Sequence, residues 1–361
     1  MKIKTNITVK TLFLFLVIPL IAKEPTLEPL PEVSIPKDNP QTKAKIELGK
    51  LLYFDPRLSG DGSTSCATCH DPNQGFAKST EMSPAYPGNK HFRHSPTVLN
   101  SAYNDKLFWD GRANSLEEQA EKPIASPFEM NMNYDLLEER LKSIPKYVEM
   151  FKKAFPGEKE PITIKNIAKA IAAFERTLIT PNSPFDRYLR GEKNALNPQQ
   201  VKGLEIFKGK ANCIQCHNGP NLTDNQLHIT GVPKAKIEDD SQVQAVRRFV
   251  LKTGGIIDYE NYDRDPGAFA STKDKKQLNA FKTPSLRNVA ITPPYMHNGV
   301  FKTLDEVIEF YNNGGGDIRN KDPKLKRLNL TKEEKEALKA FLHSLTGEIP
   351  EVEEPELPQY K

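Results

Sequence analysis

Apolar residues recur three and four positions apart in several stretches of the chain, which is the spacing of one face of an α-helix. The clearest stretch, residues 164–178, reads IKNIAKAIAAFERTL and follows Thr163, a residue type that caps helix N-termini. Further helices are predicted at residues 115–121 and 134–143. No stretch alternates apolar and polar residues as a half-buried strand does, so we predict a mainly α fold with long loops.

Two capping boxes predict helices near the end of the chain. The sequence TLDE at residues 303–306 opens a helix that stops at Asn312-Asn313-Gly314, and TKEE at 331–334 opens one that ends before Gly347. In each box the threonine and the glutamate satisfy backbone N–H groups that a helix N-terminus leaves free.

All four cysteines lie in two Cys-x-x-Cys-His pentapeptides, at residues 66–70 and 213–217. This is the attachment signature of c-type haem, in which both thiols bind the porphyrin and the histidine ligates the iron. A thioredoxin-like redox pair needs only one such motif, and zinc sites place their two pairs much closer together. Disulfides would leave the two histidines unexplained. We therefore predict two covalently bound haems c, attached through Cys66, Cys69, Cys213 and Cys216 and ligated by His70 and His217.

The two haem motifs belong to a repeat. Residues 48–54 (LGKLLYF) precede the first motif and residues 202–207 (KGLEIF) precede the second, and a helix before the motif is how small cytochromes c begin. We predict two cytochrome c-like domains, each with one haem, at residues 41–184 and 185–347. The stretch Thr180 to Pro198 is rich in loop-forming residues and is predicted to link them.

The chain ends differ from these domains in composition. Residues 1–22 combine a basic start with a short apolar run, which is typical of a signal peptide, and the alternative is an uncleaved N-terminal anchor. Export agrees with haem c, which is attached outside the cytoplasm, so we expect a periplasmic protein. Residues 23–40 are predicted to be extended, and 348–361 to be an acidic disordered tail.

The overall charge excludes one class of partner. The formal net charge of +4 falls to +1 when the three lysines of the signal segment are subtracted. Such a small charge argues against nucleic acid as a partner.

Several further motifs together resemble the bacterial di-haem cytochrome c peroxidase family. They are SPTVLN at residues 95–100, FWDGR at 108–112, KTPSLRNV at 282–289 and PYMHNG at 294–299. The resemblance covers roughly residues 40–347. It implies that the N-terminal haem reacts with hydrogen peroxide and that the C-terminal haem supplies an electron.

The resemblance also implies roles for individual residues near the first haem. Glu129 matches the catalytic glutamate of the family, which moves a proton between the two peroxide oxygens. Gln119 and Pro123 match other residues of the same pocket. Trp109, the only tryptophan, matches the residue that lies between the haems and relays electrons. Without the resemblance, Glu129 would be interpreted as a solvated loop carboxylate and Gln119 as a residue on a helix surface. Pro123 would be interpreted as a turn residue and Trp109 as a core aromatic.

The ligand opposite His217 determines the branch of the family. The methionine-ligated peroxidases carry that methionine fourteen residues beyond the histidine of the Tyr-x-His motif. Counted from His297, this position is Tyr311, as in the methylamine-utilisation (MauG-type) branch. Met296 is the alternative ligand. Arg287 and His297 are expected to hold haem propionates or to order this region.

A second departure concerns the opposite side of the first haem. Many relatives carry a distal histidine seven residues before an arginine, and that position is Tyr86 when counted from Arg93. His91 is the nearest histidine but would require a shifted loop. We therefore predict an open coordination position at rest.

Calcium is a further possible cofactor. In the family the ion lies between the haems, and Thr292 and Pro294 match its backbone donors. His94 occupies the position of the side-chain donor, and imidazole is a poor calcium ligand. His228 and His343 lie in no motif and are expected to be structural or exposed.

Three functions are compatible with these features. The first is a peroxidase that reduces hydrogen peroxide with electrons from a small cytochrome c or copper protein. The second is a MauG-like enzyme that oxidises a side chain of a partner protein. The third is a non-enzymatic di-haem electron carrier. The resemblance also makes a homodimer a possible assembly.

Overall fold

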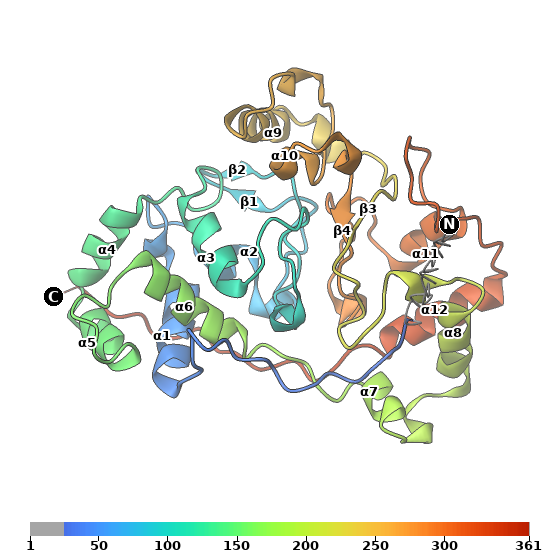
Figure 1. Ribbon diagram of the computed structural model, residues 1–361, viewed down its shortest axis with the longest axis horizontal. Helices are drawn as coiled ribbons and strands as arrows, with labels where there is room; N and C mark the ends of the chain where they lie inside the picture. The colour runs from blue at the N-terminus through green and yellow to red at the C-terminus, as the bar shows by residue number, and fades with distance from the viewer. Residues whose placement is uncertain (1–24, 361) are drawn as a thin grey trace, which may run out of the picture.

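The computed structural model describes residues 25–360, so the predicted signal peptide lies outside the described residues. The fold is mainly helical and forms two lobes that lie side by side (Figure 1). Within the described residues, no helix combines the length and the apolar character needed to cross a bilayer.

Helices of one to four turns carry most of the regular structure. They are α1 Lys43–Phe54, α2 Cys66–Cys69, α3 Leu116–Ala125, α4 Tyr134–Lys142, α5 Pro145–Ala154, α6 Ile164–Glu175, α7 Pro184–Leu189, α8 Pro198–Lys208, α9 Ser241–Thr253, α10 Phe269–Thr272, α11 Leu304–Asn312 and α12 Lys332–His343. Two small antiparallel pairs complete the fold: β1 Pro84–Ala85 with β2 Asn89–Lys90, and β3 Leu227–His228 with β4 Phe281–Lys282.

The first lobe is organised by the crossing of α1 and α6. A Cβ atom on Gly49 of α1 would lie 1.8 Å from the carbonyl oxygen of Ala170 in α6, so only glycine allows the helices to approach this closely. The core around the crossing is apolar and includes the fully buried side chains of Leu48, Leu52 and Phe151.

The second lobe repeats this arrangement with α8 and α12. A Cβ atom on Gly203 of α8 would lie 2.0 Å from the carbonyl oxygen of Ala337 in α12. Phe207 and Phe341 meet beside the contact, with ring centroids 5.1 Å apart. Each repeated glycine therefore marks the same helix crossing just before a Cys-x-x-Cys-His motif.

One segment of the second half of the chain covers the first lobe. Helix α9 packs on β2, and its Val243 and Val246 share a buried cluster with Met82 and Phe92. In Figure 1, α9 and α10 lie above the β1–β2 pair. Residues 185–347 therefore include a piece that packs against the N-terminal half.

Both chain ends run as extended segments between the lobes (Figure 1). The N-terminal segment begins at the second lobe, where the Gly219 amide donates to the Thr26 carbonyl at 2.7 Å, and leads to α1 in the first. The C-terminal segment runs the other way from α12. We call these segments the N-terminal strap (residues 25–42) and the C-terminal strap (residues 347–360).

The C-terminal strap differs from the expected disordered tail. It has no regular secondary structure, but the Arg57 guanidinium donates to the Pro358 carbonyl at 2.7 Å and lies over the Tyr360 ring. Val352 packs against the core of the first lobe. The apolar and aromatic residues between the acidic ones make these contacts, which composition alone did not reveal.

Candidate functional site

The first lobe contains a cavity beside the first Cys-x-x-Cys-His motif. It holds about 1130 Å³ of space not filled by protein atoms and opens to solvent. Its walls come from α2, the loop 83–98, α3 and α6, and they include Cys66, Cys69 and His70.

The His70 ring is oriented for metal ligation. Its Nδ1 atom lies 2.9 Å from the carbonyl oxygen of Pro96, and burial lowers the pKa of His70. A neutral ring that donates through Nδ1 keeps the lone pair of Nε2 free for a metal. Both thiols of the motif lie in the same cavity and form no disulfide, so these residues fit a covalently bound haem.

Three residues predicted for the catalytic pocket line this cavity. Gln119 and Pro123 project from α3, and Glu129 follows in the loop after it. The loop is held by the Met130 amide, which donates to the Pro123 carbonyl at 3.1 Å. The structure thus brings the carboxylate, the amide and His70 to one cavity.

His91 also lines the first cavity, whereas Tyr86, at the expected position, does not. The Arg93 amide donates to His91 Nδ1 at 3.0 Å, and burial lowers the pKa of His91 to about 4. A neutral ring that accepts at Nδ1 carries its proton on Nε2. In this arrangement Nε2 is a hydrogen-bond donor and has no lone pair for a metal, the reverse of His70.

Two buried charged residues of this cavity were not predicted. The Arg93 guanidinium forms ion pairs with Asp265 at 2.5 Å and with Asp110 at 2.9 Å, which ties the cavity wall to the segment after α9. Glu175 of α6 is 5% exposed, its Oε2 atom has no hydrogen-bond partner, and burial raises its pKa to about 8. Arg93 served above only to locate the distal position, and Glu175 belongs to no local motif.

The second lobe contains a comparable cavity of about 1280 Å³ beside the second motif. It is lined by Cys213, Cys216 and His217, and His217 Nδ1 lies 3.1 Å from the carbonyl oxygen of Leu222. Burial lowers the pKa of His217 to about 4 and raises the pKa of Cys213 to about 12. The second cavity therefore fits a haem in the same way as the first.

Tyr311 and Met296, the two candidate ligands, both line the second cavity. Tyr311 lies in the last turn of α11, and burial raises its pKa, so a cation such as a haem iron would be needed to stabilise the phenolate. Met296 sits in a tight turn with φ of 72°.

Trp109 lines both cavities and lies between them. Its Nε1–H donates to the His94 carbonyl at 2.8 Å, and its own carbonyl accepts from the Lys282 amide at 2.7 Å. The indole therefore has a fixed orientation in the wall that the two cavities share.

The two residues expected near haem propionates lie in different surroundings. His297 lines the second cavity and stacks on Phe281, with ring centroids 3.7 Å apart. Arg287 is not among the residues that line it, because its guanidinium pairs with Asp186 through two contacts of 2.9 Å and donates to the Pro220 carbonyl. Arg287 thus orders α7 and the loop after the second motif.

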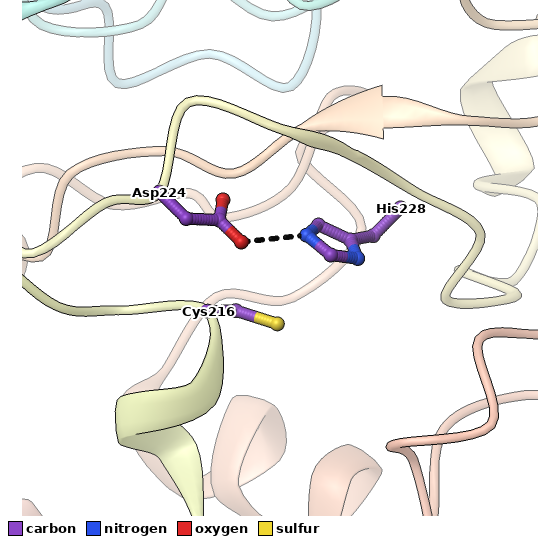
Figure 2. Close-up of side chains that lie close together, drawn as sticks. All are labelled: Cys216, Asp224 and His228. Carbon is purple, nitrogen blue, oxygen red and sulfur yellow. Dashed lines mark hydrogen bonds and ion pairs between the residues drawn. The ribbon is translucent and has the colours of Figure 1, made fainter. Parts of the chain in front are cut away.

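His228 forms an unexpected cluster at the edge of the second cavity. Its Nε2 atom lies 2.8 Å from Asp224 and its Nδ1 atom 2.5 Å from Asp322. Figure 2 shows Asp224 and His228 beside the Cys216 sulfur. Two ionised carboxylates can only accept, so both ring nitrogens donate and the imidazole is positively charged. His343, by contrast, is exposed at the end of α12.

The side chain at the expected calcium position is already engaged. His94 is 4% exposed, its Nδ1 atom lies 3.1 Å from the Thr80 carbonyl, and burial lowers its pKa to about 4. In the described part of the chain, the group of His, Cys, Asp and Glu side chains close enough to hold a metal is Cys216, Asp224 and His228, and it includes neither His94 nor the expected calcium positions Thr292 and Pro294.

Comparison with known proteins agrees with this architecture. Residues 43–194 match the family model described as di-haem cytochrome c peroxidase. The chain is 44% identical over 340 residues to Cytochrome-c peroxidase IdrP1 of Pseudomonas sp. (strain SCT), covering 92% of this chain and 89% of that protein. It is 38% identical to Methylamine utilization protein MauG of Methylorubrum extorquens, covering 90% and 84%.

A solved structure extends the likeness to three dimensions. A MauG-like protein associated with microbial copper homeostasis superimposes with a TM-score of 0.76 and 31% identity, covering 88% of this chain and 94% of that one. Identity and coverage at these levels, with two cavities that fit covalent haems, establish the relationship. The chain belongs to the di-haem cytochrome c peroxidase family.

Proposed function

We propose that this protein reduces hydrogen peroxide to two water molecules, with two protons and with two electrons from a small cytochrome c or copper protein. Named peroxidases among its relatives support this activity. The signal-like residues 1–22 support a periplasmic location.

One observation carries the proposal: Trp109 lines both the cavity that holds Glu129 and the cavity that holds Tyr311. A proton-transfer group therefore lies in one cavity, and an oxidisable indole separates that cavity from the second. This division suits a reaction in which peroxide binds in the first lobe and electrons enter through the second.

The side chains of the first cavity supply proton transfer and hydrogen bonding. Glu129 would accept a proton from the inner oxygen of peroxide and deliver it to the outer oxygen, which becomes water. His91 Nε2–H would donate a hydrogen bond to peroxide, and because that nitrogen has no free lone pair, it would not itself serve as a metal ligand.

The bound haems supply the iron that accepts peroxide and the redox centres that store and pass electrons. The protein positions them through His70 and His217. In the second lobe, Tyr311 would provide a hard anionic oxygen ligand, which lowers the reduction potential relative to methionine.

Tyr311 also favours the second candidate function, the MauG-like oxidation of a partner protein. The likeness to MauG and to the MauG-like structure supports it. A non-enzymatic carrier has less support, because it requires two saturated irons and gives Glu129 no role.

Two further points, a bound calcium ion and a homodimer, are left to experiment. Thr292 and Pro294 would offer only carbonyl oxygens and His94 is engaged, so any calcium would rely on carbonyls and water. Treatment with EDTA followed by haem spectra and assay tests this point, and gel filtration tests the homodimer.

The decisive experiment is a steady-state assay with peroxide and several reduced carriers, beside a peroxide titration without donor. Rapid carrier oxidation supports the peroxidase, whereas a slow assay with a long-lived oxidised product supports the MauG-like function. Two low-spin haems in the ferric protein and no reaction with peroxide would overturn both.

A further inference from the structure

The loop between α11 and α12, residues 313–330, forms one wall of the second cavity. Asp322, Lys324, Leu325, Lys326 and Leu328 all line it. The loop begins two residues after Tyr311, and its exposed Lys324 and Lys326 place positive charge at the edge of this cavity.

The loop is held in one arrangement by backbone hydrogen bonds. The Gly316 amide donates to the Thr230 carbonyl at 3.0 Å, and the Asp322 amide donates to the Ile229 carbonyl at 2.9 Å. At its far end, the Leu328 amide donates to the Asn312 carbonyl at 2.9 Å. Its side chains are therefore presented from a fixed backbone.

The charge of the loop is strongly positive. Residues 319–327 read RNKDPKLKR and contain five cationic residues and one carboxylate. That carboxylate, Asp322, is paired with His228. We call the four exposed cationic residues the basic rim: Arg319, Lys324, Lys326 and Arg327.

No member of the basic rim takes part in an ion pair within residues 25–360, although other lysines of this lobe do so. Lys335 pairs with Glu309 at 2.9 Å and Lys210 with Glu334 at 2.6 Å. The nearest acidic residue of the loop outside the His228 cluster is Asp317, which leaves a net positive rim. Lys324 and Lys326 line the cavity, and unpaired charges beside such a site attract a partner of opposite sign.

The His228 cluster places the loop beside the second haem-attachment motif. Asp322 contacts His228, and His228 lies beside Cys216 (Figure 2). Cys216 would attach a haem in this cavity through a thioether. The rim would therefore lie beside this attachment point, on the side of the cavity from which a redox partner could approach.

We propose that the basic rim is the docking surface for an electron-donor protein with an acidic face, which delivers its electrons to the second haem. This inference rests on the proposed peroxidase function, because it names the charge class of the donor.

The test compares wild type with Arg319→Glu/Arg327→Glu, because these two rim residues are exposed and do not line the second cavity. Plastocyanin, an acidic copper protein, and mitochondrial cytochrome c, a basic haem protein, serve as probes at about 10 mM and about 200 mM ionic strength. We expect the variant to lose about tenfold in kcat/KM and in affinity for plastocyanin at low salt. The difference should shrink at high salt. Lys152→Glu/Lys153→Glu on exposed positions of α5 is the matched control and should behave like wild type.

Two further measurements separate the possible failures. Turnover with a small dye as reductant tests the peroxidase function alone, and equilibrium binding of plastocyanin tests docking alone. Equal plastocyanin binding by variant and wild type, or tighter binding of the basic cytochrome by wild type, would overturn the docking proposal. A changed haem spectrum or dye turnover in the variant would also overturn it, because the arginines would then serve the haem itself.

Discussion

The indole of Trp109 meets the imidazole of His297 edge-on, with ring centroids 6.5 Å apart. The residue that joins them is His94, whose carbonyl accepts from the indole and whose amide donates to the His297 carbonyl at 2.7 Å. These contacts span the two lobes, so they fix the indole in the wall between the cavities.

Replacing Trp109 tests whether this wall conducts electrons. Trp109→Phe removes the most oxidisable ring, so peroxide-driven spectral changes at the second haem should slow by at least about tenfold, or about 1.4 kcal/mol of barrier. Changes at the first haem should keep their rate in stopped-flow measurements. Trp109→Tyr should recover part of the lost rate at the second haem. Equal rates in wild type and both variants would exclude electron transfer through Trp109.

Glu129→Gln keeps the shape of the side chain but removes the proton acceptor. The reaction of the ferric protein with peroxide should fall about 10²- to 10⁴-fold, the usual contribution of a positioned acid–base group. The resting spectrum should not change. Glu139→Gln, an exposed position on α4, is the control, and wild-type kinetics in the Glu129 variant would exclude proton transfer through this carboxyl.

His91 should act as a donor and not as an iron ligand. In His91→Leu the ferric spin state should stay as in wild type, while fluoride, which accepts a hydrogen bond when bound, should bind about tenfold more weakly. His91→Gln retains an N–H donor, so its fluoride affinity should lie between those of wild type and His91→Leu. A first haem that is low-spin in wild type and becomes high-spin in His91→Leu would show that Nε2 is a ligand.

Tyr311→Phe removes only the phenol oxygen. If that oxygen ligates the second iron, the low-spin ferric signal should change and the midpoint potential should rise. Tyr295→Phe, a half-buried tyrosine of the same lobe whose hydroxyl donates to the Val289 carbonyl, is the matched control. Survival of the signal in Tyr311→Phe and its loss in Met296→Leu would assign the ligand to Met296.

The His228 cluster should make stability depend on pH. The pKa of His228 is raised to about 10, chiefly by its hydrogen bond to Asp224. A raised pKa stabilises the fold fully below the ordinary value of 6.5, and this contribution disappears as pH rises toward 10. Thermal melts should therefore show wild type more stable than His228→Gln at pH 6, with the gap closing by about pH 10. A constant gap would mean that the ring contributes only by packing.

The helices whose apolar face is continuous could be predicted from the sequence. Helix α6 and the two helices with capping boxes appear within a few residues of the predicted ranges. Helix α9 could not, because its buried face includes Arg247, which is 1% exposed. A charged residue on the core side breaks the apolar period that indicates a helix.

The residues of the candidate site, too, could be predicted from the sequence only where they belong to a local motif. The two haem motifs are local in the chain, so sequence alone locates Cys66, His70, Cys213 and His217. His228 gains its role from Asp322, 94 residues away, and no local pattern records that contact. His91 faces the first cavity only because of how its loop folds between the β1–β2 pair and Arg93.

The two straps have a practical consequence. The described residues begin at the second lobe, at Thr26, and the last of them contact Arg57 of the first lobe. A film of this protein attached to an electrode through an affinity handle after Lys361 would turn the first lobe toward the support. The basic rim would then face the solution, free to exchange electrons with dissolved carriers.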